Sequence, residues 1–467
     1  MYVEQLYTGC LAEAAYYIES NGEAAIIDPL RETFPYTELA EKRGAKIKYV
    51  FETHFHADFV SGHVDLAKKT GATIVYGPTA TAGYKIHVGK DNEEFKIGNI
   101  KIKLLHTPGH TPESSTYLLI DEHGENHAIF SGDTLFLGDV GRPDLAIKSD
   151  VTEKDLAGML FDSLRNKIMP LADEVIVYPG HGAGSACGKN MSKETVGTIG
   201  EQKKTNYALR ETMTKDEFVK ELLHGILPPP QYFPKNAMMN KNGYKSIDEV
   251  MAAGLKPLSV DEFEKEKNDA IIIDTRTQGE FKDGFIPSSI FIGLNGQFAV
   301  WVGALITNLN QKIIIVSDEG KEEESVLRLA RVGYDNCVGY LKGGFKAWAN
   351  AGKPVETITS ISALELEKIA NAKPVHIIDV RKPTEYQSER LEQAESFPLD
   401  NINNWLNHLD KNETKYLHCA GGYRSMIAIS MLRKEGYQNI IDVAGGSNAI
   451  FNNTTLSKTA YVCPSTL

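Results

Sequence analysis

Residues 53–59 read Thr53-His54-Phe55-His56-Ala57-Asp58-Phe59, and the hydrophobic run Ile47-Lys48-Tyr49-Val50-Phe51 precedes them. That run predicts a strand. A strand that ends in closely spaced His, His and Asp side chains brings several metal-ligating groups into one loop at a sheet edge. Phe59 follows directly, and a phenyl ring cannot bind a metal ion. The stretch therefore predicts a metal site.

Length and composition set broad limits on the kind of protein. The chain has 467 residues, which predicts about three domains, each large enough for its own core. The net charge of −12 argues against nucleic acid as a partner. The N-terminal sequence does not read as a signal peptide, and no apolar run approaches the roughly 18 residues that cross a membrane, so we expect no membrane partner. Five scattered cysteines, an odd number, favour reduced thiols and a cytoplasmic location.

The chain divides into three predicted domains, at residues 1–245, 258–357 and 358–467. The first alternates short apolar strands with turn signals and helical stretches, and the proline-rich stretch 228–234 predicts an extended segment at its edge. The second and third are an internal repeat, with matching segments at 270–276 and 375–381, 312–316 and 414–418, and 341–345 and 443–447. This pattern predicts two α/β domains with buried parallel strands.

Three further loops strengthen the metal hypothesis. They are His106-Thr107-Pro108-Gly109-His110-Thr111, Ser131-Gly132-Asp133-Thr134 and Tyr178-Pro179-Gly180-His181-Gly182. Each places a His or Asp at the end of an apolar run, where loops converge at a sheet edge. A lone His is more often a hydrogen-bonded structural residue than a ligand. Four such loops in this order favour a shared metal site instead.

These segments, in this order, resemble the metallo-β-lactamase superfamily over about residues 1–240, which implies an αββα sandwich. Together with Asp139-Val140-Gly141-Arg142-Pro143-Asp144, they are similar to the persulfide dioxygenases, which hold one iron through two His and one Asp. Carried over to this chain, the resemblance implies that His54, His110 and Asp133 bind one Fe(II) per chain. Such a two-His-one-carboxylate triad leaves coordination positions open for O₂ and substrate.

Three other residues occupy positions that bind a second metal in the dinuclear hydrolase relatives: His56, Asp58 and His181. Many of those relatives also carry a His at the position of Phe59, so a second metal here would lose one nitrogen ligand. We interpret the three residues as groups that orient the ligands and tune the iron.

Two residues are candidates for substrate binding. Arg142 is either an ordinary salt-bridged Arg or the anchor of an anionic substrate, because a guanidinium pairs well with carboxylates. Cys187, six residues after His181, is either a small buried apolar residue or a thiol that holds or relays a persulfide.

A second chemical centre is His418-Cys419-Ala420-Gly421-Gly422-Tyr423-Arg424-Ser425, between a predicted strand and a helix expected from Met426. A short glycine-rich loop before a helix N-terminus turns backbone N–H groups inward and stabilises an anion. Cys419 would be a thiolate nucleophile that carries a sulfane sulfur, and Arg424 would add positive charge. With the upstream Asp379-Val380-Arg381, the motif resembles the rhodanese sulfurtransferases over about residues 358–455.

The first repeat departs from this motif. Its matching loop, residues 317–325, contains no Cys and is acidic, so it would repel a persulfide or sulfite anion. Residues 258–357 therefore resemble a rhodanese that has lost catalysis. Cys337 lies away from the loop and is expected in the core.

Together the resemblances imply a persulfide dioxygenase–rhodanese fusion that acts in sulfide detoxification. The expected partners are a small-molecule persulfide, O₂ and sulfite, and the chain is expected to form a homo-oligomer. One alternative is a zinc thioester hydrolase of the glyoxalase II type with an attached sulfurtransferase. Another is a non-enzymatic sulfur carrier or scaffold in which Cys419 only docks sulfur.

Overall fold

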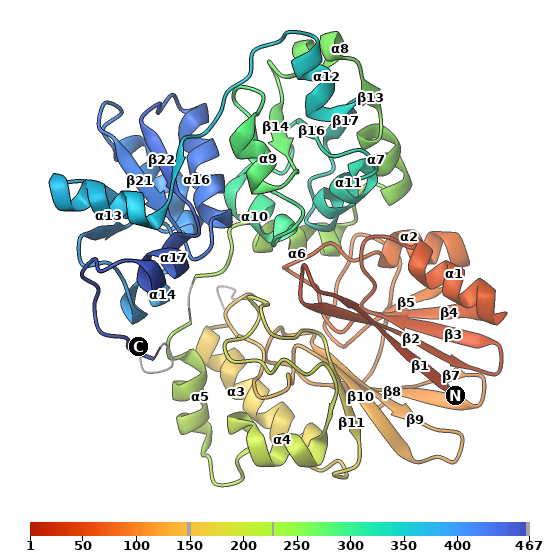
Figure 1. Ribbon diagram of the computed structural model, residues 1–467. Coiled ribbons are helices and arrows are strands. Elements are labelled where there is room, and N and C mark those ends of the chain that lie inside the picture. Colours follow the sequence, from red (N-terminus) through yellow and green to blue (C-terminus); the bar gives the residue numbers. More distant parts are fainter. Residues whose placement is uncertain (147–150, 227, 464–467) are drawn as a thin grey trace. The chain divides into compact units, whose positions relative to one another are not determined.

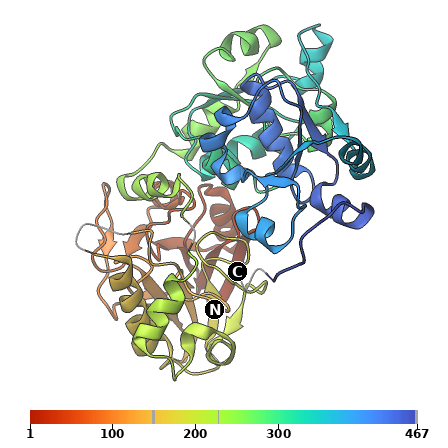
Figure 2. The ribbon, with the colours of Figure 1, turned by 90° about the vertical axis from the view of Figure 1, so that its left-hand side faces the viewer.

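The computed structural model describes residues 1–146, 151–226 and 228–463. These residues form two compact units, which can be followed by colour in Figures 1 and 2. The first comprises Met1–Glu249 together with Ala330–Gly333, and the second comprises Val250–Leu329 and the chain from Tyr334 onward. Among the described helices, none combines the length and the apolar character that a membrane span requires.

The first unit contains two six-stranded sheets. The first sheet has the order β1 (Tyr2–Thr8), β2 (Glu13–Ser20), β3 (Glu23–Ile27), β4 (Lys46–Phe51), β5 (Thr73–Tyr76) and β6 (His87–Val88). Strands β1 to β3 are antiparallel, and the strands from β3 to β6 are parallel. The second sheet has the order β12 (Gly197–Thr198), β11 (Ile176–Pro179), β10 (Asn126–Gly132), β9 (Ser115–Ile120), β8 (Ile100–His106) and β7 (Glu94–Ile97).

Apolar side chains that alternate along these strands form the layer between the two sheets. Tyr16, Phe51, Phe95, Tyr117 and Phe130 lie in this layer, in contact across the two sheets. Helices α1 (Phe34–Arg43) and α2 (His63–Thr70) pack on the outer face of the first sheet. Helices α3 (Glu153–Ser163), α4 (Ile199–Thr205) and α5 (Lys215–Leu223) pack on the second (Figure 1). The predicted αββα sandwich is confirmed.

The second unit contains two five-stranded sheets with the same strand order. The first is β13 (Pro257–Leu258), β17 (Cys337–Leu341), β16 (Ile313–Val316), β14 (Ile271–Asp274) and β15 (Ile290–Phe291). The second is β18 (Ser360–Ile361), β22 (Ile440–Val443), β21 (Lys415–His418), β19 (His376–Asp379) and β20 (Ala394–Ser396). All strand pairs in both sheets are parallel, so the predicted repeat of α/β folds is confirmed.

Helices cover these sheets because parallel strands are joined by crossover helices. Those of the first repeat are α8 (Val260–Glu266), α9 (Gln278–Asp283), α10 (Phe298–Leu305), α11 (Glu322–Arg331) and α12 (Gly344–Asn350). Those of the second are α13 (Ala363–Ala372), α14 (Pro383–Ser388), α15 (Ile402–Trp405), α16 (Tyr423–Lys434) and α17 (Gly446–Asn453). Cys337 begins β17 and is fully buried, as expected for a core residue.

Two local expectations change in the structure. The helix expected from Met426 begins at Tyr423, because Gly422 already ends the loop with a left-handed backbone at φ 108°. The proline-rich stretch 228–234 ends as helix, since Pro234 takes an early position of α6 (Phe233–Asn242), where its missing N–H costs nothing. The predicted domain boundaries stay a prediction, and residues 464–467 of the third predicted domain lie outside the described residues.

Candidate metal centre and candidate thiol site

His54 is held by a hydrogen-bonded chain that starts at Asp28, directly after β3. The Asp28 carboxylate accepts the backbone N–H of Thr53 at 2.7 Å and the Thr53 hydroxyl at 2.8 Å. Because that hydroxyl donates to Asp28, its oxygen is left to accept from Nδ1–H of His54 at 3.0 Å. This arrangement places the proton of the imidazole on Nδ1 and leaves the lone pair of Nε2 available to a metal.

His110 lies in the loop between β8 and β9 and is oriented in the same way. Its Nδ1 is 2.7 Å from the backbone carbonyl oxygen of Arg142, which can only accept a hydrogen bond. The Nδ1 atom therefore carries the proton, and Nε2 is again the free donor atom. Both imidazoles meet the requirement that a metal-binding His has its other nitrogen fixed by an acceptor.

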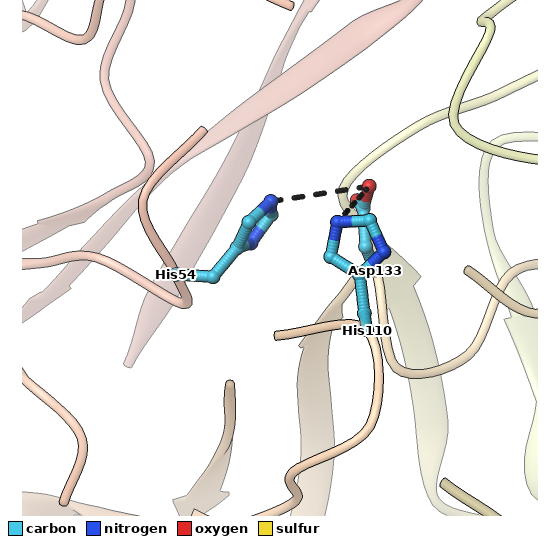
Figure 3. A group of neighbouring side chains, drawn as sticks. All are labelled: His54, His110 and Asp133. Carbon is cyan, nitrogen blue, oxygen red and sulfur yellow. Dashed lines mark ion pairs between the residues drawn. The ribbon is translucent and has the colours of Figure 1, made fainter. Parts of the chain in front are cut away.

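Asp133 follows β10 and completes the group. Figure 3 shows His54, His110 and Asp133 on separate loops, with ion pairs joining both imidazoles to the carboxylate. Oδ2 of Asp133 lies 4.0 Å from Nε2 of His54 and 3.5 Å from Nε2 of His110. This oxygen is buried and has no hydrogen-bond partner among the described residues. Two imidazole lone pairs and an orphaned carboxylate oxygen within 4.8 Å of one another fit one metal ion.

The charges around the group favour the metal-binding protonation states. Burial alone would raise the pKa of Asp133, but His181, His110 and His54 outweigh it and lower that pKa. Burial, together with the neighbouring His56, lowers the pKa of His54 well below its usual range. A carboxylate and a neutral imidazole are the forms that coordinate a metal.

His181 joins the metal group to Asp58. Its Nδ1 lies 2.8 Å from Oδ1 of Asp133, and its Nε2 lies 2.8 Å from Oδ2 of Asp58. Burial opposes protonation of His181, but the two carboxylates outweigh it and raise its pKa. Both ring nitrogens are therefore occupied, and His181 fixes the direction in which Asp133 presents Oδ2.

Cys187 lies nearer to this network than the sequence indicated. Its Sγ is grouped with ligand atoms of Asp58 and His181 within 4.8 Å. Burial and the charges of Asp58 and Asp133 raise the pKa of the thiol well above its usual value. The thiol is thus a neutral, buried group beside the carboxylates, and the glycine-rich loop around it gave no signal of this position.

His56 lies beside His54 and faces two buried acids. Its Nε2 lies 3.1 Å from Oδ1 of Asp28 and 3.5 Å from Oε2 of Glu52. Glu52 also faces His63, and burial lowers the pKa of His63 to about 3. Sequence reasoning missed Asp28 and Glu52, although each ends or follows a buried strand.

Phe59 fills the position next to the metal loop with an apolar ring. It is fully buried, and its ring lies 4.4 Å from that of His56. The loop is fixed by Asn240 of α6, whose amide donates to the carbonyl oxygens of His56 and Phe59, both at 2.8 Å. The side-chain Oδ1 atom of Asn240 accepts the backbone N–H of Ser61 at 2.9 Å. Nothing in the local sequence links Asn240 to this loop.

Arg142 is already paired through its side chain. Its guanidinium makes two hydrogen bonds of 2.7 Å to the carboxylate of Asp144 and one of 3.3 Å to the carbonyl oxygen of Ala186. Its backbone N–H donates to the carbonyl oxygen of Cys187 at 3.1 Å. Arg142 therefore ties the loop that holds His110 to the loop that carries Cys187.

Cys419 lies at the junction of β21 and α16. The Gly422 N–H points at its Sγ atom at 3.1 Å, and the N-terminus of the twelve-residue α16 follows. The start of α17 packs against the same loop, where Ser447 N–H donates to the Cys419 carbonyl oxygen at 2.7 Å. A backbone N–H aimed at sulfur and a following helix N-terminus are features that favour an anion.

Arg424 stands beside this loop and is held by Glu385. The two side chains make two hydrogen bonds, of which one is 2.8 Å long. Burial alone would lower the pKa of Arg424, but the Glu385 carboxylate outweighs it and raises that pKa. Asp379 and Arg381 form a buried pair behind the loop. Cys419 and Arg424 both line one cavity.

The first repeat keeps the frame but not the chemistry. Asp274 and Arg276 pair as Asp379 and Arg381 do. The loop between β16 and α11 contains Asp318 instead of a thiol, and burial and the nearby Glu280 raise the pKa of that acid. This loop has no sulfur nucleophile.

Known families match both units of the chain. Residues 8–181 match the metallo-beta-lactamase superfamily, and residues 259–351 and 362–453 each match the rhodanese-like domain. A solved metallo-beta-lactamase structure from Staphylococcus aureus subsp. aureus COL is 33% identical with a TM-score of 0.64. The match covers 73% of this chain and 98% of the Staphylococcus chain.

Curated relatives match the first unit. The mitochondrial persulfide dioxygenase of Homo sapiens is 30% identical over 211 residues, which are 45% of this chain and 74% of that protein. A probable hydroxyacylglutathione hydrolase of Schizosaccharomyces pombe is 32% identical over 182 residues, which are 38% of this chain and 66% of that protein.

We predict that Asn240→Ala weakens metal retention about tenfold, the effect typical of groups that orient metal ligands. The change leaves two buried carbonyl oxygens and one buried N–H without their partner, which costs about 3 kcal/mol of stability. Metal content after dialysis against a chelator and the melting temperature measure the two effects. Asn242→Ala, an exposed position in the same helix, is the matched control. Equal metal retention in both variants would contradict the role of Asn240.

Proposed function

We propose, from the premise that this chain belongs to the metallo-β-lactamase superfamily as a persulfide dioxygenase–rhodanese fusion, that it converts persulfide sulfur to thiosulfate in two steps. The first step oxidises a low-molecular-weight persulfide with O₂ to sulfite. The second transfers a sulfane sulfur through Cys419 to that sulfite. The observation that carries the proposal is the His54, His110 and Asp133 group, whose donor atoms converge on one point.

The first step has the balance RSSH + O₂ + H₂O → RSH + SO₃²⁻ + 2 H⁺. One Fe(II) per chain, when bound by His54, His110 and Asp133, supplies open coordination positions for O₂ and for the terminal sulfur. His181 keeps Asp133 aimed at the metal position, and Phe59 excludes a further ligand. We assign Arg142 and Cys187 to the substrate side, since their loops are joined by a backbone hydrogen bond beside the metal group.

The second step is an exchange at sulfur without net oxidation. The Cys419 thiolate attacks the terminal sulfur of a persulfide, the S–S bond of the donor breaks, and the carrier leaves as RS⁻. A lone pair on the sulfur of SO₃²⁻ then attacks the outer sulfur on Cys419. This releases S₂O₃²⁻ together with the proton of the transferred sulfur, which RS⁻ or water takes up, and restores the thiolate. Arg424 compensates the negative charge of the incoming anion.

The two proposed activities act one after the other on the same sulfur compounds. The product of the first step is the acceptor of the second, and a covalent tether raises its effective concentration at Cys419. We also propose a cytoplasmic location, a homo-oligomer and the domain division 1–245, 258–357 and 358–467.

The second candidate is a zinc thioester hydrolase with an attached sulfurtransferase. It is favoured by the similarity to hydroxyacylglutathione hydrolases. Against a second metal ion, both ring nitrogens of His181 are occupied by carboxylates, and the position after Asp58 is Phe59. Hydrolysis of thioesters by the zinc-loaded protein, with no O₂ uptake by the iron-loaded protein, would favour this candidate.

We predict that Asp133→Ala abolishes O₂ uptake and lowers the iron content to less than about a tenth, because only two of the three protein ligands remain. The same loss is expected for His54→Ala and His110→Ala. Elemental analysis and an oxygen electrode with glutathione persulfide measure the two quantities. His123→Ala, an exposed His on a turn, is the control and keeps both. Stoichiometric iron and full O₂ uptake in Asp133→Ala would refute the ligand assignment.

We predict that Cys419→Ser leaves O₂ uptake within about twofold of the unaltered protein, because the metal group lies in the other unit. The product shifts from thiosulfate to sulfite, since a Ser hydroxyl cannot carry a sulfane sulfur. The acidic loop of the first repeat has no thiol to replace it. Chromatography of products from the same persulfide with added sulfite measures the shift. Undiminished thiosulfate would transfer the role to another thiol, with Cys187 the first to test.

A further inference from the structure

A cavity of about 440 Å³ opens beside Cys419, and both rhodanese-like domains line it. This cavity lies within the second unit. The catalytic side consists of Lys382, Cys419, Gly421, Tyr423 and Arg424. The opposite side, the silent wall, consists of Gln278, Asn295, Gly296, Gln297 and Trp301. It comes from the first rhodanese-like domain, here called the silent domain because its loop has no cysteine.

The two sides of the cavity are joined by specific contacts. Tyr423, in the first turn of α16, donates its hydroxyl to the carbonyl oxygen of Gly293 at 2.7 Å. Its ring lies edge-on to Phe291, with ring centroids 5.6 Å apart. A Cβ atom at Gly296 would lie 2.4 Å from the Tyr423 ring, so the backbone of the silent wall approaches as closely as a glycine permits. The residue that follows the thiol loop is thus packed against the silent domain.

The chemistry of the two sides differs. The catalytic side carries the cations Lys382 and Arg424, of which Arg424 is paired with the Glu385 carboxylate. The charge of Lys382 suits the anionic sulfur and sulfite. The silent wall presents the neutral amides of Gln278, Asn295 and Gln297 together with the indole of Trp301. The side-chain amide of Asn295 donates to the side-chain Oε1 atom of Gln278 at 3.0 Å. This one bond uses only part of the donors and acceptors of the two side-chain amides.

We propose that the silent domain selects the thiol carrier at the sulfurtransferase site, with Asn295 and Gln297 binding amide groups of the carrier. This rests on the proposed transfer function and names its substrate class: a persulfide whose organic part carries amide or peptide groups. The organic part of such a carrier extends beyond the sulfur that Cys419 attacks. The silent wall lines the same cavity as Cys419, so it can contact that organic part. An inorganic donor such as thiosulfate has no organic part and does not use the wall.

The test uses the full-length chain with the double variant Asn295→Ala/Gln297→Ala and three sulfur donors. Glutathione persulfide carries amides, 2-hydroxyethyl persulfide carries none, and thiosulfate has no carrier. Cyanide is the common acceptor in every assay, and thiocyanate is the measured product. The metal centre takes no part in this reaction. Asn310→Ala, an exposed Asn in the same domain and outside the cavity, is the matched control.

The expected result is a KM for glutathione persulfide raised about tenfold with kcat within twofold, the size of a lost hydrogen-bonding group. The KM values for 2-hydroxyethyl persulfide and thiosulfate stay within twofold, as do all three in Asn310→Ala. An equal loss with all donors would show a merely structural role, and no loss with glutathione persulfide would show that the wall does not bind it. Either outcome overturns the proposal.

The failure of the transfer function itself would appear elsewhere. The unaltered protein would then transfer sulfur from thiosulfate but from neither persulfide, which overturns both proposals at once. A defect confined to the double variant concerns the wall alone.

Discussion

The candidate metal centre depends on one pair of hydrogen bonds, in which Thr53 donates its backbone N–H and its hydroxyl to the carboxylate of Asp28. These bonds fix the loop that leaves β4 and the proton position on His54. The same carboxylate faces His56, so a single buried acid sets the orientation of two imidazoles. A buried carboxylate is costly unless it is hydrogen-bonded, and Asp28 meets this condition through the loop that it orients.

The strands of the sandwich position the three loops of the site. His54, His110 and Asp133 each follow a strand of the sandwich, so the packing of the two sheets brings the three loops together. Gly132, with φ of 50°, sits where a Cβ would lie 2.4 Å from the Thr53 hydroxyl oxygen. The close approach of these two loops therefore requires a residue without a side chain. Asn240 of α6 holds the same loop through hydrogen bonds to the carbonyl oxygens of His56 and Phe59.

The second unit contains one fold twice, with different residues in the matching loops. Both repeats have the same strand order and the same buried Asp–Arg pair behind the loop. Of the two matching loops, only that of the second repeat has a thiol, and the Gly422 N–H points at its sulfur. The first repeat is free of the requirement to stabilise an anion, and its loop is acidic. Its strands and their connecting loops still supply the surface that packs against Tyr423.

The sequence by itself determined which residues can carry the chemistry. Ligand types at strand ends, the thiol loop, Phe59 and the loss of the Cys in the first repeat are local patterns, and strand period and turn residues are encoded locally. The start of α16 at Tyr423 was missed by three residues, because a glycine in the left-handed conformation sets that boundary. Only the tertiary structure decided which distant residues meet. Asn240 reaches Phe59 across 181 positions, Cys187 lies beside Asp58 and His181, and Asn295 lies across a cavity from Cys419. Such contacts follow from the packing of sheets and helices, which no short stretch of sequence specifies.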